Sequence, residues 1–270
     1  MLLGAGGGGG AGGSDTATFG VGGAGGAGGR GGLLFGAAGA AGAAGASGPT
    51  VLPNAGDAYV TNSGDNTVSV LSPTGQLLAT LTTVSDPYGV AVSETGVNAG
   101  DVYVTNLTSG TVSVFSPTNQ FLATLTVGSH PYGVAVSAAG GTAGDVYVTN
   151  YGNGTVSGFT PTGQSLATLT VGTSPEGVGV SAVGSTIGDI YVANTGSDNV
   201  AVFDPAGTSI ATITVGSLPI GVAVSPADNA YVTNFGGDTV SEIQPSTTQA
   251  GQFSVTTLTV GSEPVNVAIA

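Results

Sequence analysis

From about residue 50 onward, hydrophobic and polar residues alternate in short runs that end at Gly, Pro, Asn or Ser. In FLATLTV (121–127), the first, third, fifth and seventh residues are Phe, Ala, Leu and Val, and Thr occupies two of the positions between them. This period of two is typical of a β-strand that buries one face. One stretch of the chain therefore predicts four consecutive strands, GVAV (133–136), DVYVT (145–149), TVSGF (155–159) and SLATLTV (165–171).

The same stretch recurs along the chain at a nearly constant spacing. The tyrosines of DAYVTN, DVYVTN, DVYVTN, DIYVAN and NAYVTN are Tyr59, Tyr103, Tyr147, Tyr191 and Tyr231, so the successive steps are 44, 44, 44 and 40 residues. The last step is shorter because SPADNAYV (225–232) has a tighter loop. Four strands in such a period are the repeat of a β-propeller, in which four-stranded sheets stack around an axis and bury both faces against each other.

Two other repeat folds agree less well with this spacing. The turns of a right-handed β-helix are much shorter than this period, and immunoglobulin-like units need about 100 residues each. The GVAV-type strand is predicted to be innermost because it is the least polar and has Ala or Gly between its valines, at Ala91, Ala135, Gly179 and Ala223. We therefore expect an all-β fold of the propeller type.

The order of the strands predicts how the propeller closes. The region begins with a second-type strand, DAYVT (57–61), and ends with a first-type strand, VNVAIA (265–270). Combined in one blade, these two ends give a five-bladed β-propeller of four-stranded antiparallel blades, in which the C-terminal strand completes blade one and removes exposed sheet edges. Such a ring predicts a monomer, and it predicts that deletion of residues 264–270 destabilises the whole domain.

The first 49 residues differ from the rest of the chain. They are mostly Gly and Ala, as in GVGGAGGAGGRGG (20–32), which predicts a flexible or weakly ordered tract of low complexity. SGPTVLPN (47–54) has the composition of a linker, so we divide the chain into a segment 1–49 and a repeat domain 50–270. The G-x-G-x-x-G patterns of the tract follow no strand and precede no helix, so they do not indicate a nucleotide site.

The charge excludes several classes of partner. The chain has 15 Asp and Glu residues and a single basic residue, Arg30, for a formal net charge of −14. Without basic side chains it is not expected to bind nucleic acid or an anionic membrane surface. It has no Cys, and therefore no disulfide or thiolate metal site. No apolar stretch is long enough to span a membrane, and MLLGAGGGGG (1–10) is not a signal peptide.

The repeat domain resembles a known family. Its recurrent D-x-Y-V-T-N, T-V-S-V, P-T-G-Q, L-A-T-L-T-V-G and P-x-G-V-A-V-S motifs resemble those of the YVTN-repeat (YncE-like) β-propellers over residues 54–270. The resemblance implies a propeller fold and leaves the activity open, because such propellers serve as surface-layer, binding and occasionally enzymatic scaffolds. Many relatives have seven blades, so the resemblance also leaves open a partial ring or one completed by another chain.

Residues 1–49 resemble another group. GGAGGAGGRGGLLFGAAGAAGAAG (22–45) is similar to the glycine-rich region of the PE-PGRS family, cell-envelope and secreted proteins of mycobacteria. The resemblance implies a location in the cell envelope or outside the cell. The helical PE domain of that family, which carries its export information, has no counterpart in this sequence.

Propeller geometry predicts one place where chemistry could be concentrated. The loops that enter the innermost strands and the loops that follow YVTN should meet at one mouth of the central channel. This arrangement would gather Asp86, Tyr88, His130, Tyr132, Glu176 and Glu263. Carboxylates at a channel mouth could hold Ca²⁺, as in the lactonase-like propeller enzymes. Because the residues differ from blade to blade, we interpret them as an acidic rim and expect no catalytic, cofactor or metal site.

The remaining repeated polar residues have an architectural interpretation. His130, the only histidine, precedes a proline and is predicted to be an exposed loop residue. An asparagine ends each second strand and is predicted to satisfy loop backbone groups. These residues are Asn62, Asn106, Asn150, Asn194 and Asn234.

The sequence predicts a non-enzymatic protein of the cell envelope or exterior, whose propeller presents an acidic binding surface to a protein or a glycan. Two alternatives remain open. One is a Ca²⁺-dependent, lactonase-like hydrolase that uses the channel mouth, and the other is a purely structural surface component.

Overall fold

The computed structural model describes residues 56–249 and 251–269. These ranges contain strands and short 3-10 turns, and no helix in them is long and apolar enough to cross a membrane. The N-terminal tract 1–49 and the expected linker 47–54 lie outside the described residues.

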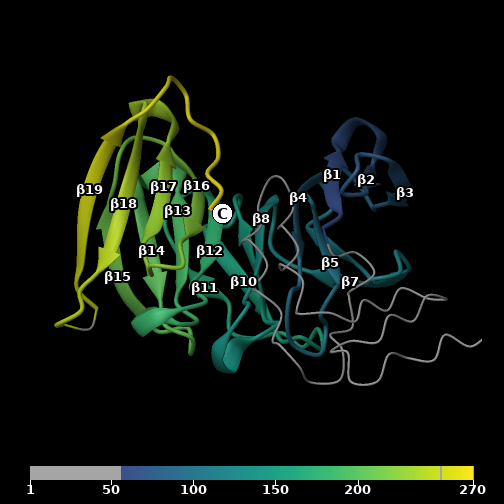
Figure 1. The fold of residues 1–270 in the computed structure, drawn as a ribbon, viewed down its shortest axis with the longest axis horizontal. Coiled ribbons are helices and arrows are strands. Elements are labelled where there is room, and N and C mark those ends of the chain that lie inside the picture. The colour runs from purple at the N-terminus through teal and green to yellow at the C-terminus, as the bar shows by residue number, and fades with distance from the viewer. Residues whose placement is uncertain (1–55, 250, 270) are drawn as a thin grey trace, which may run out of the picture.

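The strands form five antiparallel sheets within the described residues (Figure 1). The first sheet has three strands, β1 (Ala58–Asn62), β2 (Thr67–Leu71) and β3 (Leu77–Thr82). The second to fifth sheets have four strands each. The second sheet contains β4 (Pro87–Val92), β5 (Val102–Asn106), β6 (Thr111–Phe115) and β7 (Phe121–Thr126), and the third contains β8 (Pro131–Val136), β9 (Val146–Asn150), β10 (Thr155–Phe159) and β11 (Leu169–Thr170). The fourth contains β12 (Pro175–Val180), β13 (Ile190–Asn194), β14 (Asn199–Phe203) and β15 (Ser209–Thr214), and the fifth contains β16 (Pro219–Val224), β17 (Ala230–Asn234), β18 (Thr239–Pro245) and β19 (Phe253–Thr259). The 3-10 turns are η1 (Ser63–Asp65), η2 (Gly140–Thr142), η3 (Gly184–Thr186), η4 (Thr195–Ser197) and η5 (Phe235–Gly237).

The predicted order of strands within a repeat is confirmed, with one exception in length. The outer strand β11 has two residues, whereas its counterparts have six or seven. Gly158 of β10 stands where three of the other four third strands have valine and β18 has Glu242, and a Cβ placed on it would lie 3.2 Å from Cβ of Leu166. Leu166 therefore occupies the space of the missing side chain, while its backbone N–H donates to the Gly158 carbonyl at 2.8 Å. Residues 167 and 168 lie outside the ladder that was predicted for SLATLTV.

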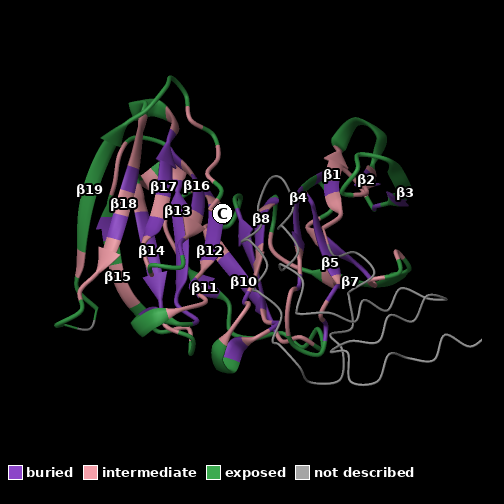
Figure 2. Cartoon of the chain, viewed as in Figure 1, coloured by how far each residue is buried: buried purple, intermediate pink, exposed green. Residues whose placement is uncertain are grey.

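The core lies between neighbouring sheets, as the apolar residues on both faces of the strands predict (Figure 2). One cluster packs Tyr103 and Val112 of the second sheet against Val146 and Phe159 of the third. The next cluster packs Tyr147 of the third sheet against Val192 and Phe203 of the fourth. Each fully buried valine or phenylalanine stabilises the fold by about 1.5 to 3 kcal/mol, so stacking stabilises these sheets where a single sheet would be marginal.

The innermost strands β4, β8, β12 and β16 pack side by side in sequence order, and β1 packs on β4 (Figure 1). Their backbones approach so closely that a Cβ on Gly133 would lie 2.4 Å from the carbonyl oxygen of Glu176 in the next sheet. A glycine at this position is therefore a requirement of the stacking. The arrangement is of the propeller type, and the strand with small residues is innermost, as predicted.

The repeated asparagines make contacts beyond those predicted. The side-chain amide of Asn150 donates to Thr155 Oγ1 at 3.0 Å and Ser157 Oγ at 2.9 Å on the neighbouring strand. Its Oδ1 accepts from the backbone N–H of Gly128 at 2.9 Å. The bond to the Gly128 N–H is the predicted contact with a loop backbone group. The contacts to the hydroxyls were not predicted, and they join the second strand to the third because paired strands place the hydroxyls within reach.

The predicted closure strand is not formed in the structure. Residues 260–269 contain no strand, and within the described residues β1 pairs with β2 alone. The structure therefore confirms the sheets and their stacking, and the closed five-bladed ring stays a prediction.

Candidate functional site at the start of the inner strands

In the second to fifth sheets, two loops meet at the end where the inner strand begins. The backbone N–H of Tyr151, after the second strand, donates to the carbonyl of His130, before the inner strand, at 3.0 Å. The equivalent bond from Leu107 to Asp86 is also 3.0 Å, and the one from Thr195 to Ser174 is 3.1 Å. The predicted meeting of these loops is confirmed, and we call this end of the sheets the mouth.

The residue before each inner-strand proline has a left-handed backbone. The φ angle is 48° at Asp86, 52° at His130 and 52° at Glu263. Such angles are uncommon for residues other than glycine, and they turn the chain sharply into the strand. Each of these three residues belongs to a different step of the repeat, and the side chains of His130 and Glu263 are exposed. Their shared role is therefore the turn, and the structure does not bring these three side chains together.

The next residue along supplies an aromatic surface. The rings of Tyr88 and Tyr132, in adjacent inner strands, have centroids 3.9 Å apart with a tilt of 43°. Tyr151 extends the row, with its ring centroid 5.8 Å from that of Tyr132 and a tilt of 31°. Tyr88 is 37 % exposed and Tyr151 is 40 % exposed, so the row is open to solvent at both ends. We call Tyr88, Tyr132 and Tyr151 the tyrosine row.

Tyr151 is the site residue that the sequence analysis missed. It follows Asn150 directly, where the other repeats have Ser63, Leu107, Thr195 and Phe235. A departure from the repeat next to the predicted mouth was the available signal. Its meaning depended on the loop pairing between Tyr151 and His130, which alignment of the repeats alone does not show.

Glu176 occupies the position of Tyr88 and Tyr132 in the next inner strand, and it lies beside the row. Burial raises the pKa of the Glu176 carboxyl, and a hydrogen bond with Thr195 opposes this shift. Burial also raises the pKa of Tyr132, reinforced by its hydrogen bond with Tyr88 and by the charge of Glu176. The mouth therefore combines flat aromatic faces with one carboxyl group whose proton is held more tightly than usual.

Of the six residues predicted for the mouth, the structure brings together Tyr88, Tyr132 and Glu176. Asp86, His130 and Glu263 lie on the entering turns. Within residues 56–249 and 251–269, no group of three or more His, Cys, Asp or Glu side chains is arranged to hold a metal ion.

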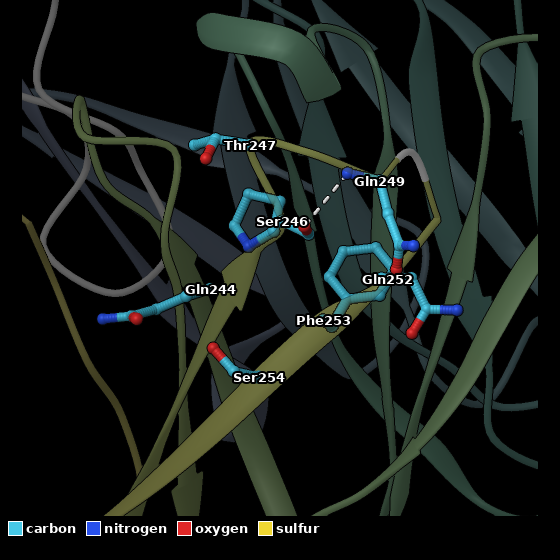
Figure 3. Close-up of a pocket in the computed structure, with 8 residues that line it drawn as sticks. Gln244, Ser246, Thr247, Gln249, Gln252, Phe253 and Ser254 are labelled. Atoms are coloured by element: carbon cyan, nitrogen blue, oxygen red, sulfur yellow. Dashed lines mark hydrogen bonds between the residues drawn. The ribbon is translucent and has the colours of Figure 1, made fainter.

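A separate hollow of about 490 Å³ lies at the hairpin between β18 and β19 (Figure 3). It is lined by Gln244, Pro245, Ser246, Thr247, Gln249, Gln252, Phe253 and Ser254. The Ser246 hydroxyl accepts from the backbone N–H of Gln249 at 3.1 Å, so it serves the hairpin turn. None of the lining side chains titrates near neutral pH, and the hollow therefore offers no acid or base for chemistry.

The opposite end of the sheets carries an acidic contact between the fourth and fifth sheets. The Asp228 carboxylate accepts from Ser181 Oγ at 3.0 Å, from the backbone N–H of Ser185 at 3.0 Å and from the Thr186 hydroxyl. Nearby, burial raises the pKa of Asp189 to about 7, with further contributions from the charges of Asp204 and Asp228. Because Asp228 already joins two sheets through these bonds, the contact is structural.

Comparisons with known proteins identify the fold but no family. No protein-family profile matches the chain, and no curated protein matches it. Among solved structures it is similar to a streptogramin B lyase, with a TM-score of 0.64 and 16 % identity over 79 % of this chain and 69 % of that one. The virginiamycin B lyase of Staphylococcus aureus has a TM-score of 0.65 and 13 % identity, over 80 % of this chain and 71 % of that one. A protein of Bacteroides uniformis, named provisionally as a 6-phosphogluconolactonase, has a TM-score of 0.63 and 15 % identity, over 77 % and 69 %.

These similarities confirm the propeller part of the sequence resemblance at the level of fold. The PE-PGRS resemblance concerns residues outside the described ranges, and no comparison supports it. The expectation that the protein is not an enzyme is wrong as an inference from the fold, because solved structures with this fold carry the names of enzymes. The reason is physical: the same sheets can carry different sites, and function depends on the side chains of the site and not on the fold.

Proposed function

We propose that this protein binds an uncharged glycan at the tyrosine row. The observation that carries the proposal is the row itself, in which two partly exposed tyrosines flank a third beside Glu176. The apolar faces of sugar rings stack on aromatic faces, and a few convergent polar groups orient the ligand. Glu176 and the tyrosine hydroxyls are suited to hydrogen bonds with sugar hydroxyls.

The charge of the protein supports an uncharged ligand. Residues 56–270 contain no Lys or Arg, so the propeller has no guanidinium or ammonium group with which to bind a phosphate or sulfate. An acidic protein also repels anionic ligands at long range. A cell-envelope or extracellular location, implied by the resemblance of residues 1–49, is part of the proposal because glycans are abundant there.

The test is a glycan-array screen with the full chain, followed by calorimetry on the glycan that binds. Tyr88→Ala and Tyr151→Ala should each weaken binding by about tenfold, since an aromatic contact contributes about 1 kcal/mol beyond its buried area. Phe121→Ala is the matched control, because Phe121 is 58 % exposed on the outer strand β7 and lies away from the mouth. Equal affinities in all three variants would remove the tyrosine row from the proposal.

A second candidate function is acid–base turnover of a bound ester or lactone at the same site. Glu176 favours it, because a carboxyl group with a raised pKa beside a tyrosine hydroxyl is a suitable proton donor or acceptor. The names of the similar solved structures are compatible with such chemistry, and the lack of basic groups favours an uncharged lactone over a phosphorylated one. A lactone panel assayed with and without Ca²⁺ tests this candidate: Glu176→Gln should abolish turnover, because an amide cannot exchange the proton that the carboxyl group supplies.

A further inference from the structure

Within the tyrosine row, Tyr88 and Tyr132 lie much closer together than Tyr132 and Tyr151. The ring centroids are 3.9 Å apart in the first pair and 5.8 Å apart in the second. Two aromatic rings joined by a carbon–carbon bond have centres only slightly farther apart than those of Tyr88 and Tyr132. The two hydroxyls are hydrogen-bonded, and the ortho carbons flank the carbon that bears each hydroxyl. The ortho positions of the two rings therefore lie near one another.

The backbone holds this pair in register. Tyr88 and Tyr132 lie in the adjacent inner strands β4 and β8. Thr105 Oγ1 accepts from the backbone N–H of Gly89 at 2.7 Å and donates to the carbonyl of Tyr132 at 2.8 Å. Thr61 Oγ1 donates to the carbonyl of Tyr88 at 2.9 Å. Because these bonds fix both backbones, the two rings stay in proximity, and proximity raises the effective concentration of one reacting group at the other.

The composition of the chain directs oxidation to tyrosine. Peroxides readily oxidise the sulfur atoms of cysteine and methionine, but this chain has no Cys, and its single methionine is Met1. It also has no Trp. Tyrosines are therefore the most easily oxidised side chains of residues 56–249 and 251–269.

Exposure distinguishes the tyrosine row from most of the other tyrosines. Tyr88 and Tyr151 are partly exposed, whereas four tyrosines are buried in the core. These four are Tyr59, Tyr103, Tyr147 and Tyr191. The remaining one, Tyr231, donates from its hydroxyl to Glu242 Oε1 at 2.8 Å. An oxidant in solution therefore reaches the row before it reaches the core tyrosines.

We propose that Tyr88 and Tyr132 form an intramolecular dityrosine when the protein meets hydrogen peroxide and a peroxidase. Each phenol loses one electron and its hydroxyl proton and becomes a phenoxyl radical, whose unpaired electron is shared with the ortho carbons. The two radicals couple at these carbons, and the ring hydrogens move to the oxygens and restore both phenols. Two ring C–H bonds are thereby replaced by one C–C bond. The two electrons and two protons reduce one molecule of peroxide to two molecules of water.

The product is a covalent link between β4 of the second sheet and β8 of the third. The charge of the chain favours this link over coupling between molecules, because copies with a formal net charge of −14 repel one another.

The test is oxidation of the full chain by hydrogen peroxide and a haem peroxidase at several protein concentrations. Dityrosine fluorescence should appear in the monomer fraction, with a yield per molecule that does not change with concentration. After denaturation and cleavage at glutamate, the fragment that ends at Glu94 should remain joined to the fragment 95–176. The joined species should have lost the mass of two hydrogen atoms.

Phenylalanine variants identify the two coupled residues. Tyr88→Phe and Tyr132→Phe should each abolish the monomeric product, because phenylalanine keeps the ring and lacks the phenol. Tyr151→Phe is the matched control, since Tyr151 belongs to the same row and is 40 % exposed, and it should keep the product. Loss of the product in Tyr151→Phe, or its retention in Tyr88→Phe, would assign the bond to another pair and overturn the proposal. Dityrosine confined to dimers and larger species, or no dityrosine at all, would also overturn it. The readout is a covalent bond, so it is independent of glycan binding.

Discussion

Tyr132 and Gly133 are neighbours in β8, yet the structure constrains them in opposite ways. Gly133 faces the carbonyl of the next sheet, and the same position is glycine in all four inner strands that were assigned as strands. Tyr132 faces the mouth, and its position is occupied by Tyr88, Tyr132, Glu176 and Ile220 in successive sheets. We call the first set framing positions and the second set lining positions. The repeat preserves what stacking requires and varies what the mouth presents, so the lining positions are where function is to be sought.

Gly133→Ala, a change at a framing position, should lower the stability of the protein most strongly. The added Cβ would lie 2.4 Å from the Glu176 carbonyl oxygen, a backbone atom of the next sheet that cannot move aside as a flexible side chain could. We expect a loss of about 3 kcal/mol in the free energy of unfolding, at the upper end for overpacking, measured by urea denaturation. Gly141→Ala is the control, because a Cβ there would have no neighbour within 4 Å. Equal midpoints for the two variants would contradict the framing role.

Asn150→Ala should have the next largest effect. It removes the contacts to Thr155 and Ser157 and leaves the Gly128 N–H without its acceptor, for an expected loss of about 2 kcal/mol. Asn62→Ala removes the equivalent contacts to Thr67 and Ser69 in the half-buried first sheet, and about half that loss is expected. A larger loss at Asn62 than at Asn150 would show that burial does not set the strength of these amide contacts.

Asp189→Asn tests the contact between the fourth and fifth sheets, at the end opposite the mouth, through the pH dependence of the stability. The folded-state pKa of Asp189 is raised to about 7 from 3.8, so the folded state binds the proton more tightly than the unfolded state. Asp189 therefore favours folding at low pH, and this contribution is lost as the pH rises from about 4 to about 7. The variant should be more stable than the natural chain at pH 7.5, by on the order of 1 kcal/mol or about 3 °C in Tm.

The control for that experiment is Asp65→Asn, which removes the same charge from an exposed turn. It should leave the slope of Tm against pH unchanged between pH 5 and 7.5. If both variants flattened the slope equally, the effect would belong to net charge and not to burial of Asp189.

Tyr88→Ala, a change at a lining position, should have the smallest effect on stability. Its side chain is partly exposed and contacts the ring of Tyr132, so a loss of about 0.5 kcal/mol is expected. Ligand binding should nevertheless weaken by about tenfold under the proposed function. A stability loss as large as that of Gly133→Ala would place Tyr88 among the framing residues.

Much of the fold could be predicted from the repeat, and the failures have identifiable causes. The short β11 follows from Leu166 packing over Gly158, a contact between strands that no pattern within one strand reveals. Closure of the ring stays a prediction, because residues 260–269 form no strand within the described residues. Tyr88, Tyr132 and Glu176 were predicted to share the mouth, whereas Tyr151 joined them through a loop contact between residues 130 and 151.

The sequence by itself determined the period, the order of the strands, the innermost strand and the absence of basic groups from the propeller. These properties depend on local alternation and composition, which are written directly in the chain. Only the tertiary structure decided that three tyrosines form one row, that the asparagine amides join adjacent strands, and that the two ends of the arc lie apart. Each of these depends on distances between residues of different strands or sheets, which arise from packing and from where a side chain leaves no room for the next backbone.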